Sequence, residues 1–489
     1  MGIRVAVLGI ALLALAPAST RNIDVRSIDI RSIGNAVHVD GIREQVDSTP
    51  SWVDPSELGR RLWAIERGFY ESRGYEPAWV DGDRTTPHMK ELVQQFRYSE
   101  LHGFDPSRYP IEEFERIHRQ SQTRMGTRFD VERVPELDAK LTYGYLLYAS
   151  ELIGWNTAPT QVSRNWMATP KEEHDLAAHL ADAIASNRVR DSLEALAPNH
   201  PQYKGLQAAL ARERQNPTGS VEKIRMNLER WRWMPRDLGD RYVLINVPGY
   251  MLQVMEGDDA VVAMRVVVGK PDTPTPLFSD EMTYIVFSPY WNIPDNILRD
   301  ETMPRVVKDP DFLQRNNMEV IGTSGAVDPS SVDWSDDEAT SGLRFRQRPG
   351  PGNALGFVKF IFPNHFSIYL HDTPSRRLFS REHRTLSHGC IRIENPVGLA
   401  EYVLRDQPQW TAARISAAMH SGQERAVTLS TKLPVHIGYW TAWVQPDGSV
   451  SFTDDPYGLD PVHARLMENQ LESAGSWPSS PASGLRSVS

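Results

Sequence analysis

Residues 366–371 read Phe-Ser-Ile-Tyr-Leu-His, and residues 387–392 read Ser-His-Gly-Cys-Ile-Arg. The first stretch alternates apolar and polar residues, which predicts a strand with Ser367, Tyr369 and His371 on one face. The second stretch carries Cys390, the only cysteine among 489 residues, and we expect a turn there. The two stretches together predict a cleft where a strand delivers a histidine and a turn delivers a thiol.

A thiol flanked by histidines indicates a nucleophile with its base. The thiolate is the reactive form, and a free thiol of pKa near roughly 8.5 is only a few per cent ionised at neutral pH. His371 and His388 are both candidate bases, and their spacing does not choose between them. Gly389 lets the backbone approach closely, so that N–H groups around Cys390 can hold an oxyanion.

Two other interpretations of the cysteine were weighed. A buried, inert cysteine is common in proteins, but a single free thiol in an oxidising compartment is a liability unless it is used. His371, His383, His388 and Cys390 are of the right types for zinc, yet they lack the spacing of familiar zinc motifs. We therefore expect no metal and no other cofactor.

Strand patterns surround this centre. They occupy 242–247, 251–255, 260–268, 282–287, 357–362 and 366–370, and a terminal hairpin is predicted at 435–444 and 449–453. Asn395 and Pro396 together predict the start of a helix. Residues 290–355 are turn-rich and show no long periodic segment, which favours a lid or insertion.

The chain before residue 220 has helical spacing instead. Leu58, Leu62, Ile65 and Phe69 recur as on a helix, further helices are expected at about 87–103 and 135–154, and 221–233 follows as a charged packing helix. Residues 1–18 predict a secretory signal, because Arg4 precedes a short apolar run that ends in Ala-Pro-Ala. The alternative is an uncleaved N-terminal anchor. The net charge of −10 argues against a nucleic-acid partner and an anionic membrane surface.

The sequence resembles the L,D-transpeptidase (YkuD-type) family. The resemblance is carried by His371, then fifteen residues, then Ser-His-Gly-Cys at 387–390. Residues 227–233 (Asn-Leu-Glu-Arg-Trp-Arg-Trp), 268–270 (Val-Gly-Lys) and 353–356 (Asn-Ala-Leu-Gly) are similar to the long Gram-negative branch, in which a helical scaffold precedes the catalytic domain. Residues 103–106 (Gly-Phe-Asp-Pro) are similar to that scaffold.

The resemblance implies an α+β chain in which a helical scaffold domain precedes a mainly β catalytic domain. The expected limits are a signal peptide at 1–18, a linker at 19–50, the scaffold at 51–220, the catalytic domain at 221–465 with a capping insertion at 291–355, and a disordered tail at 466–489. The long branch usually carries a small peptidoglycan-binding module between the scaffold and the catalytic domain. Residues 216–221 leave no room for it here, so the scaffold or the lid would have to dock the wall instead.

The resemblance also implies residue roles. Cys390 would attack the L,D-peptide bond of a tetrapeptide stem and His371 would be its base. His388 would be structural or assist the site, and Gly389 would belong to the catalytic turn. Substrate contacts would come from Tyr369, Arg392, Trp291 and Ser387. Peptidoglycan stems would be donor and acceptor, wall-synthesis enzymes would supply donors, and carbapenems would acylate the thiol. An exported enzyme of this kind would work in the periplasm.

Other functions remained open at this point. An L,D-carboxypeptidase or hydrolase would use water in place of an amine acceptor, and the motif does not separate the two. A catalytically idle wall-binding protein is a third hypothesis, against which the intact histidine–cysteine pair argues. A papain-like protease is disfavoured, because there the cysteine precedes the histidine in the chain.

Overall fold

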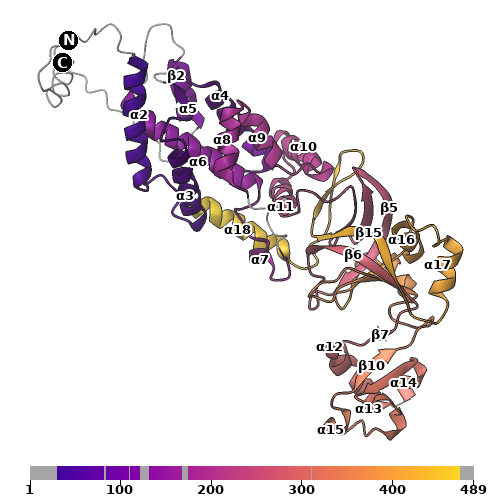
Figure 1. Cartoon of the computed structure of the whole chain (residues 1–489). Helices are drawn as coiled ribbons and strands as arrows, with labels where there is room; N and C mark the ends of the chain where they lie inside the picture. Colours follow the sequence, from indigo (N-terminus) through magenta and orange to yellow (C-terminus); the bar gives the residue numbers. More distant parts are fainter. Residues whose placement is uncertain are drawn as a thin grey trace, which may run out of the picture.

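The computed structural model describes residues 30–473, except 82–83, 110, 122–130, 168–173 and 310. A helical domain, a β domain and a small insertion follow one another along an elongated molecule (Figure 1). The predicted α+β architecture, helical first and mainly β afterwards, is confirmed. The predicted signal at 1–18 lies outside the described residues. Within the described part, none of the helices combines the length and the apolar character that a membrane crossing requires.

The helical domain is built around one central helix, α6 (Val134–Leu152), which is buried on nearly all sides. Its apolar residues are therefore buried on several sides of the helix, whereas helical spacing predicts a single buried stripe. Helices that pack against α6 or its neighbours are α2 (Ile30–Asp47), α3 (Glu57–Ser72), α4 (Pro87–Tyr98), α5 (Ile111–Ser121), α8 (Leu176–Ala185) and α9 (Val189–Leu196). Smaller elements are β1 (Val80–Asp81), β2 (Arg84–Thr85), η2 (Ser99–His102), η3 (Pro106–Arg108), η4 (Val131–Arg133) and α7 (Pro159–Val162).

The predicted linker at 19–50 is wrong for its second half. Residues 30–47 form α2, which lies along α6 and buries Ile42 and Val46 in the core of the helical domain. Gly41 makes this close approach possible, since a Cβ there would meet the ring of Pro135 at 2.5 Å. Few apolar residues suffice because a glycine lets the two helices touch.

The β domain is a nine-stranded sheet in the order β13-β5-β14-β12-β11-β6-β15-β3-β4, and a further β4–β5 pairing closes it on itself. Buried residues from its strands fill one large apolar core. The strands are β3 (Arg241–Asn246), β4 (Met251–Glu256), β5 (Asp259–Gly269), β6 (Phe278–Phe287), β11 (Val358–Ile361), β12 (Leu370–His371), β13 (Thr385–Ser387), β14 (Ile391–Ile393) and β15 (Arg425–Gly438). Helices α16 (Pro396–Val403) and α17 (Ala412–Met419) pack beside it, and Asn395 caps α16 as predicted.

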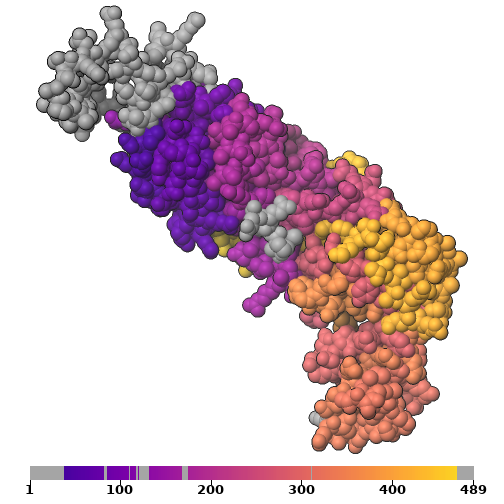
Figure 2. Space-filling model, in the orientation of Figure 1, coloured from indigo at the N-terminus to yellow at the C-terminus, as the bar shows by residue number. Residues whose placement is uncertain are grey.

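The insertion is not the coreless loop that the sequence suggested. It forms a four-stranded sheet, β7-β10-β8-β9, around its own core of Ile293, Val306, Leu313, Val320 and Phe345. It projects as a separate lobe at the end of the molecule opposite the helical domain (Figure 2). Its elements are too short to show a period: β7 (Trp291–Asn292), α12 (Asp295–Ile297), η5 (Leu298–Thr302), α13 (Met303–Lys308), α14 (Asp311–Arg315), β8 (Met318–Gly322), β9 (Gly325–Val327), η6 (Pro329–Ser331), α15 (Asp337–Thr340) and β10 (Arg344–Gln347).

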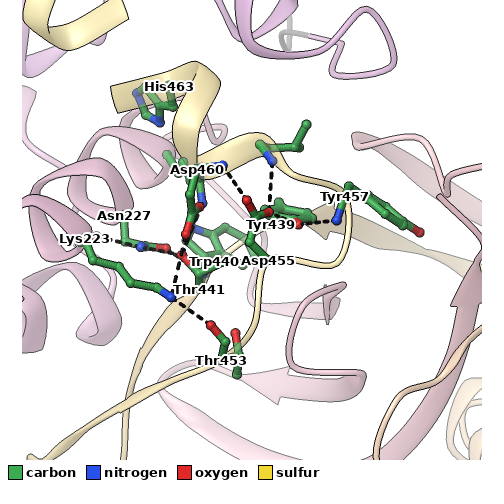
Figure 3. Close-up of polar contacts among 12 residues, drawn as sticks. Lys223, Asn227, Tyr439, Trp440, Thr441, Thr453, Asp455, Tyr457, Asp460 and His463 are labelled. Carbon is green, nitrogen blue, oxygen red and sulfur yellow. Dashed lines mark hydrogen bonds and ion pairs between the residues drawn. The ribbon is translucent and has the colours of Figure 1, made fainter. Parts of the chain in front are cut away.

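The junction between the two large domains is a buried polar network (Figure 3). Helix α10 (Pro201–Gln215) passes through residues 216–220 into α11 (Val221–Arg232), which carries most of the Asn-Leu-Glu-Arg-Trp-Arg-Trp segment. The Asn227 side chain accepts a hydrogen bond from the Thr441 amide at 2.8 Å, and the fully buried Arg230 pairs with Asp460 at 2.8 Å. Glu229 lies 3.2 Å from His463. These contacts at the domain junction account for the polar residues of the segment.

The C-terminal part differs from its prediction in two ways. The hairpin consists of β16 (Ala442–Val444) and β17 (Val450–Phe452), whereas residues 435–438 belong to the long strand β15 of the main sheet. The predicted disordered tail begins inside a helix, α18 (Leu459–Ser473), and residues 474–489 lie outside the described part. Helix α18 runs back toward the helical domain (Figure 1), where the Gln470 amide donates to the Asn156 carbonyl and the Thr157 hydroxyl.

Candidate active site

Two short parallel strands bring the predicted histidine and cysteine together. In the β12–β14 ladder Leu370 lies opposite Ile391 and His371 opposite Arg392, so Cys390 enters beside Tyr369. The amide of Ile391 donates to the Tyr369 carbonyl at 3.2 Å. Sequence separation of nineteen residues is thus converted into neighbouring positions on one sheet.

The predicted strand at 366–370 is mostly a loop. The side-chain oxygen of Asn364 accepts from the amides of Phe366 and Ile368, and Ser367 adopts a left-handed backbone with φ of 58°. This local hydrogen bonding competes with strand pairing. Ser367 therefore does not share a strand face with Tyr369 and His371, although the Tyr369 and His371 rings remain neighbours, with centroids 5.8 Å apart.

The His371 ring is buried and held in a defined orientation. Its Nδ1 lies 2.6 Å from the carbonyl oxygen of Asp372, so Nδ1 carries the proton and Nε2 is left as the acceptor. Burial, and after it the charge of Arg392, lowers the pKa of His371 to about 3. A neutral imidazole with a free Nε2 can accept a proton at physiological pH.

The seat of Asp372 explains one of the motifs. Its carboxylate accepts from the Phe357 amide at 2.9 Å, and a Cβ at Gly356 would lie 2.3 Å from that carboxylate. Gly356 has a φ of 61° and closes the Asn-Ala-Leu-Gly segment. The side-chain amide of Asn353, at the start of this segment, donates to three carbonyls at the root of the insertion, those of residues 289, 347 and 348. The sequence alone does not indicate this structural role for the segment.

Cys390 is partly buried beside these groups. Burial raises the pKa of its thiol to about 11, while hydrogen bonds from Tyr369 and the positive charge of Arg392 act in the opposite direction. Burial also raises the pKa of the Tyr369 hydroxyl, which therefore stays a donor toward sulfur. The Arg392 guanidinium is largely buried, and its Nε has no partner among the described residues. Resting thiol and imidazole are both neutral in this arrangement.

The turn that presents Cys390 is locked from inside. The Ser387 hydroxyl donates to the Cys390 carbonyl at 2.6 Å and accepts from the Gly389 amide at 3.2 Å. Gly389 has a φ of 115°, which favours glycine, and its carbonyl accepts from Thr275 at 2.7 Å. Ser387 is only 2% exposed, and its hydroxyl shapes the turn; the substrate contact expected for it stays a prediction.

The Val-Gly-Lys segment supports the same turn from the neighbouring strand. The Lys270 amide donates to the Ser387 carbonyl at 2.9 Å, and the Gly269 amide donates to the Thr275 hydroxyl at 2.9 Å. A Cβ at Gly269 would lie 2.2 Å from the Thr273 carbonyl oxygen. Thr275 was missed by sequence reasoning, because nothing local distinguishes it from other threonines.

The His388 side chain contacts the insertion. Its Nε2 lies 2.6 Å from the Glu301 carboxylate, which sits in the π-helical turn η5. Glu301 also lies 3.9 Å from Arg305. Single π-helical turns are frequent at functional sites. Spacing alone does not choose between the two histidines as the base. His371 is buried and held by a hydrogen bond, which suits a base, whereas His388 links the turn of Cys390 to the insertion.

The remaining predicted residues lie farther from this cluster. Trp291 begins β7, pairs with Gln347 of β10 and packs against the core of the insertion. His383 lies 3.8 Å from Asp454, on the surface. In the part of the chain that the structure describes, no group of three or more histidine, cysteine or acidic side chains is placed to hold a metal ion.

Comparisons with known proteins match both large domains of the chain. Residues 240–437 match the family profile of the L,D-transpeptidase catalytic domain, and residues 66–210 match that of the Scaffold domain. A Haemophilus influenzae protein named "Putative L,D-transpeptidase" is 28% identical over 395 residues, which is 80% of this chain and 77% of that protein.

Two solved mycobacterial structures are also similar to the chain. An L,D-transpeptidase from Mycobacterium smegmatis is 14% identical with a TM-score of 0.19, and the match covers 40% of this chain and 58% of that one. L,D-transpeptidase 1 of Mycobacterium tuberculosis is 13% identical with a TM-score of 0.17, over 41% of this chain and 59% of that one. This chain thus spans less than two thirds of either structure.

Proposed function

The chain belongs to the L,D-transpeptidases, with a Scaffold domain ahead of its catalytic domain, and we propose that it cross-links peptidoglycan stems through a thioacyl-enzyme formed on Cys390. The observation that carries this proposal is the seat of His371. Its Nδ1 is fixed on the Asp372 carbonyl at 2.6 Å, and the parallel β12–β14 pairing sets its strand beside that of Cys390. An oriented base beside a lone thiol is what nucleophilic catalysis requires.

The acylation step follows from the neutral pair. As Sγ of Cys390 attacks the carbonyl carbon of the L,D-peptide bond, its proton passes to Nε2 of His371. The tetrahedral oxyanion is held by backbone N–H groups of the turn around Gly389, and the Arg392 charge offsets the negative charge that develops nearby. Collapse breaks the C–N bond, and the leaving amine takes the proton from His371. A thioester on Cys390 remains.

Transfer to the acceptor reverses the proton movement. The side-chain amine of a second stem attacks the thioester carbonyl and gives a proton to Nε2 of His371. When the C–S bond breaks, the sulfur of Cys390 leaves as a thiolate and recovers that proton. Tyr369, whose hydroxyl donates to the sulfur, stabilises the thiolate as it departs.

We assign the insertion the role of a cap over this centre. It is joined to the β domain at its root by Asn353 and touches the catalytic turn through Glu301 and His388, 2.6 Å apart. A cap that excludes water favours the amine acceptor over hydrolysis of the thioester. Trp291, at the root of the cap, and Arg392 are the substrate-contact residues in this proposal.

The cellular setting is part of the same proposal. We place the enzyme in the periplasm, exported by the segment at 1–18. Tetrapeptide stems are its donors and acceptors, wall-synthesis enzymes supply the donors, and carbapenems acylate Cys390 in the way a donor stem does.

An L,D-carboxypeptidase is the second candidate, because the same thioester yields a shortened stem when water is the acceptor. Mass spectrometry of muropeptides made by the wild type and by Cys390→Ala separates the two. Cross-linked dimers that depend on Cys390 support the transpeptidase, and shortened monomers alone support the carboxypeptidase. Products that persist in Cys390→Ala would refute both, because both need the thioester on Cys390. Neither product from the wild type would leave the chain as a wall-binding protein without catalysis.

A further inference from the structure

A polar cleft lies in the helical domain, away from the active site. It has a volume of about 900 Å³ and is lined by segments far apart in the sequence. Its walls include the first turns of α3, residues 155–161 with α7, and Gln470 of α18. Helix α18 folds back and contributes Gln470 to one side of the cleft. The sequence alone therefore does not predict the cleft. This volume is in the range of sites that bind small molecules and peptides.

One wall of the cleft presents opposite charges that the fold does not use. Glu57 and Arg61 are one turn apart on α3 and are both exposed. Neither the carboxylate nor the guanidinium has a hydrogen-bond or ion-pair partner among the described residues, and the two do not pair with each other. Residues four apart on a helix lie on one face, about 6 Å apart. The wall thus carries a separated anion and cation at a fixed spacing.

The guanidinium is nevertheless held in place. Its carbon lies 3.6 Å from the centroid of the Trp155 ring, which belongs to the facing wall. Stacking of this kind orients the planar group while its N–H donors remain available. Arg61 is therefore arranged for a carboxylate that the protein itself does not supply.

The rest of the lining includes side-chain amides as well as the ionisable residues Asp54, Arg108, His174 and Asp175. Asn156, Gln161 and Gln470 contribute side-chain amides to the cleft. The side-chain oxygen of Asn156 is buried, and no described residue donates to it. A buried carbonyl oxygen without a donor is costly, and a bound N–H or a water removes the cost.

We infer that this cleft binds a peptide end that carries an ammonium and a carboxylate on one carbon, the former toward Glu57 and the latter toward Arg61. Peptide amides would complete the contacts with the side-chain amides. The inference rests on the proposed function, since a peptidoglycan stem whose side chain ends in an amino-acid head group, with amine and carboxylate on one carbon, is such a ligand. The cleft would hold the wall on the helical domain, in a chain without a separate peptidoglycan-binding module.

The test is calorimetric titration of full-length Cys390→Ala with a soluble stem peptide that has a free amino-acid head group. Two sites per chain are expected, one in each domain. Glu57→Gln with Arg61→Gln should abolish one of them, or weaken it at least tenfold, and leave the other unchanged. Arg67→Gln, a matched change on an exposed arginine of the same helix, should leave both unchanged. Melting temperatures and thiol labelling of the same variants with Cys390 restored check that each domain is folded.

Ligand variants identify the chemistry. Acetylating the head-group amine or amidating its carboxylate should each weaken the helical-domain site at least tenfold. Two sites of wild-type affinity in the double variant would overturn the inference, as would equal weakening by Arg67→Gln. Failure of the proposed function would look different: the muropeptide products of the wild type would lack Cys390-dependent cross-links whatever the cleft variants bind.

Discussion

Replacing Glu301 with glutamine tests the cap at its contact with the catalytic turn. The change removes the negative charge that faces Nε2 of His388 and preserves the size of the side chain. A hydrogen bond to a charged group contributes about 1.5–3 kcal/mol. The two side chains are 28% and 36% exposed, so solvent screening reduces this to about 1 kcal/mol. That energy corresponds to a shift of about fivefold in the balance between a closed and an open cap.

The assay is the ratio of hydrolysed to cross-linked product at a fixed acceptor concentration. We expect Glu301→Gln to raise this ratio up to about fivefold, while a small thiol reagent labels Cys390 within twofold of the wild-type rate. Asp300→Asn is the matched control, because it removes the neighbouring exposed charge that pairs with Arg299 and leaves His388 untouched. An unchanged ratio in Glu301→Gln, or an equal rise in Asp300→Asn, would refute the cap as a water-excluding element.

Further predictions concern the reacting groups and the junction. His371→Gln should slow acylation of Cys390 by roughly 10²–10⁴, the usual loss when a positioned base is removed, measured by mass spectrometry of a carbapenem adduct. With the thiol pKa near 11, labelling of wild-type Cys390 by iodoacetamide should rise about tenfold per pH unit from pH 7 to 9, and a plateau near pH 8.5 would contradict the burial argument. Arg392→Met removes a cation that lowers the pKa of both groups, so the thiol pKa should rise and labelling at pH 9 should fall; the pKa of His371, read by NMR, should rise as well. Arg230→Met removes the nearest cation from Asp460, which keeps Lys223 at 3.7 Å, and should cost less in urea unfolding than the about 3–5 kcal/mol of a fully unpaired buried charge, whereas the double change with Asp460→Asn should recover part of that loss.

The sequence by itself determined the parts of the molecule that depend on short-range pattern. Helical spacing at Leu58, Leu62, Ile65 and Phe69 corresponds to α3, and Asn395 caps α16 as its type and position require. Alternation and turn residues located β3, β4, β5, β6 and β11 of the main sheet. The order of His371 before the Ser-His-Gly-Cys turn pointed to the family, because residue types and spacing are local properties.

Elements too short to show a period escaped this reasoning. The insertion was expected to lack a core, yet its two- to five-residue strands build one once they pair. Helix α2 has few apolar residues and was taken for a linker, but Gly41 lets it lie directly on the helical domain. In both places tertiary pairing supplied stability that no local pattern displays.

Only the tertiary structure distinguished the positions of the two histidines. His371 lies nineteen residues and His388 two residues before Cys390, and neither spacing says which ring faces the thiol. The fold buries one ring on the Asp372 carbonyl and turns the other toward Glu301, 87 residues earlier in the chain. The same holds for Gly356, whose missing side chain makes room for Asp372, and for the cleft between α3 and α18. Such assignments depend on which distant segments meet, and the free energy of those meetings comes from packing, which residue spacing does not record.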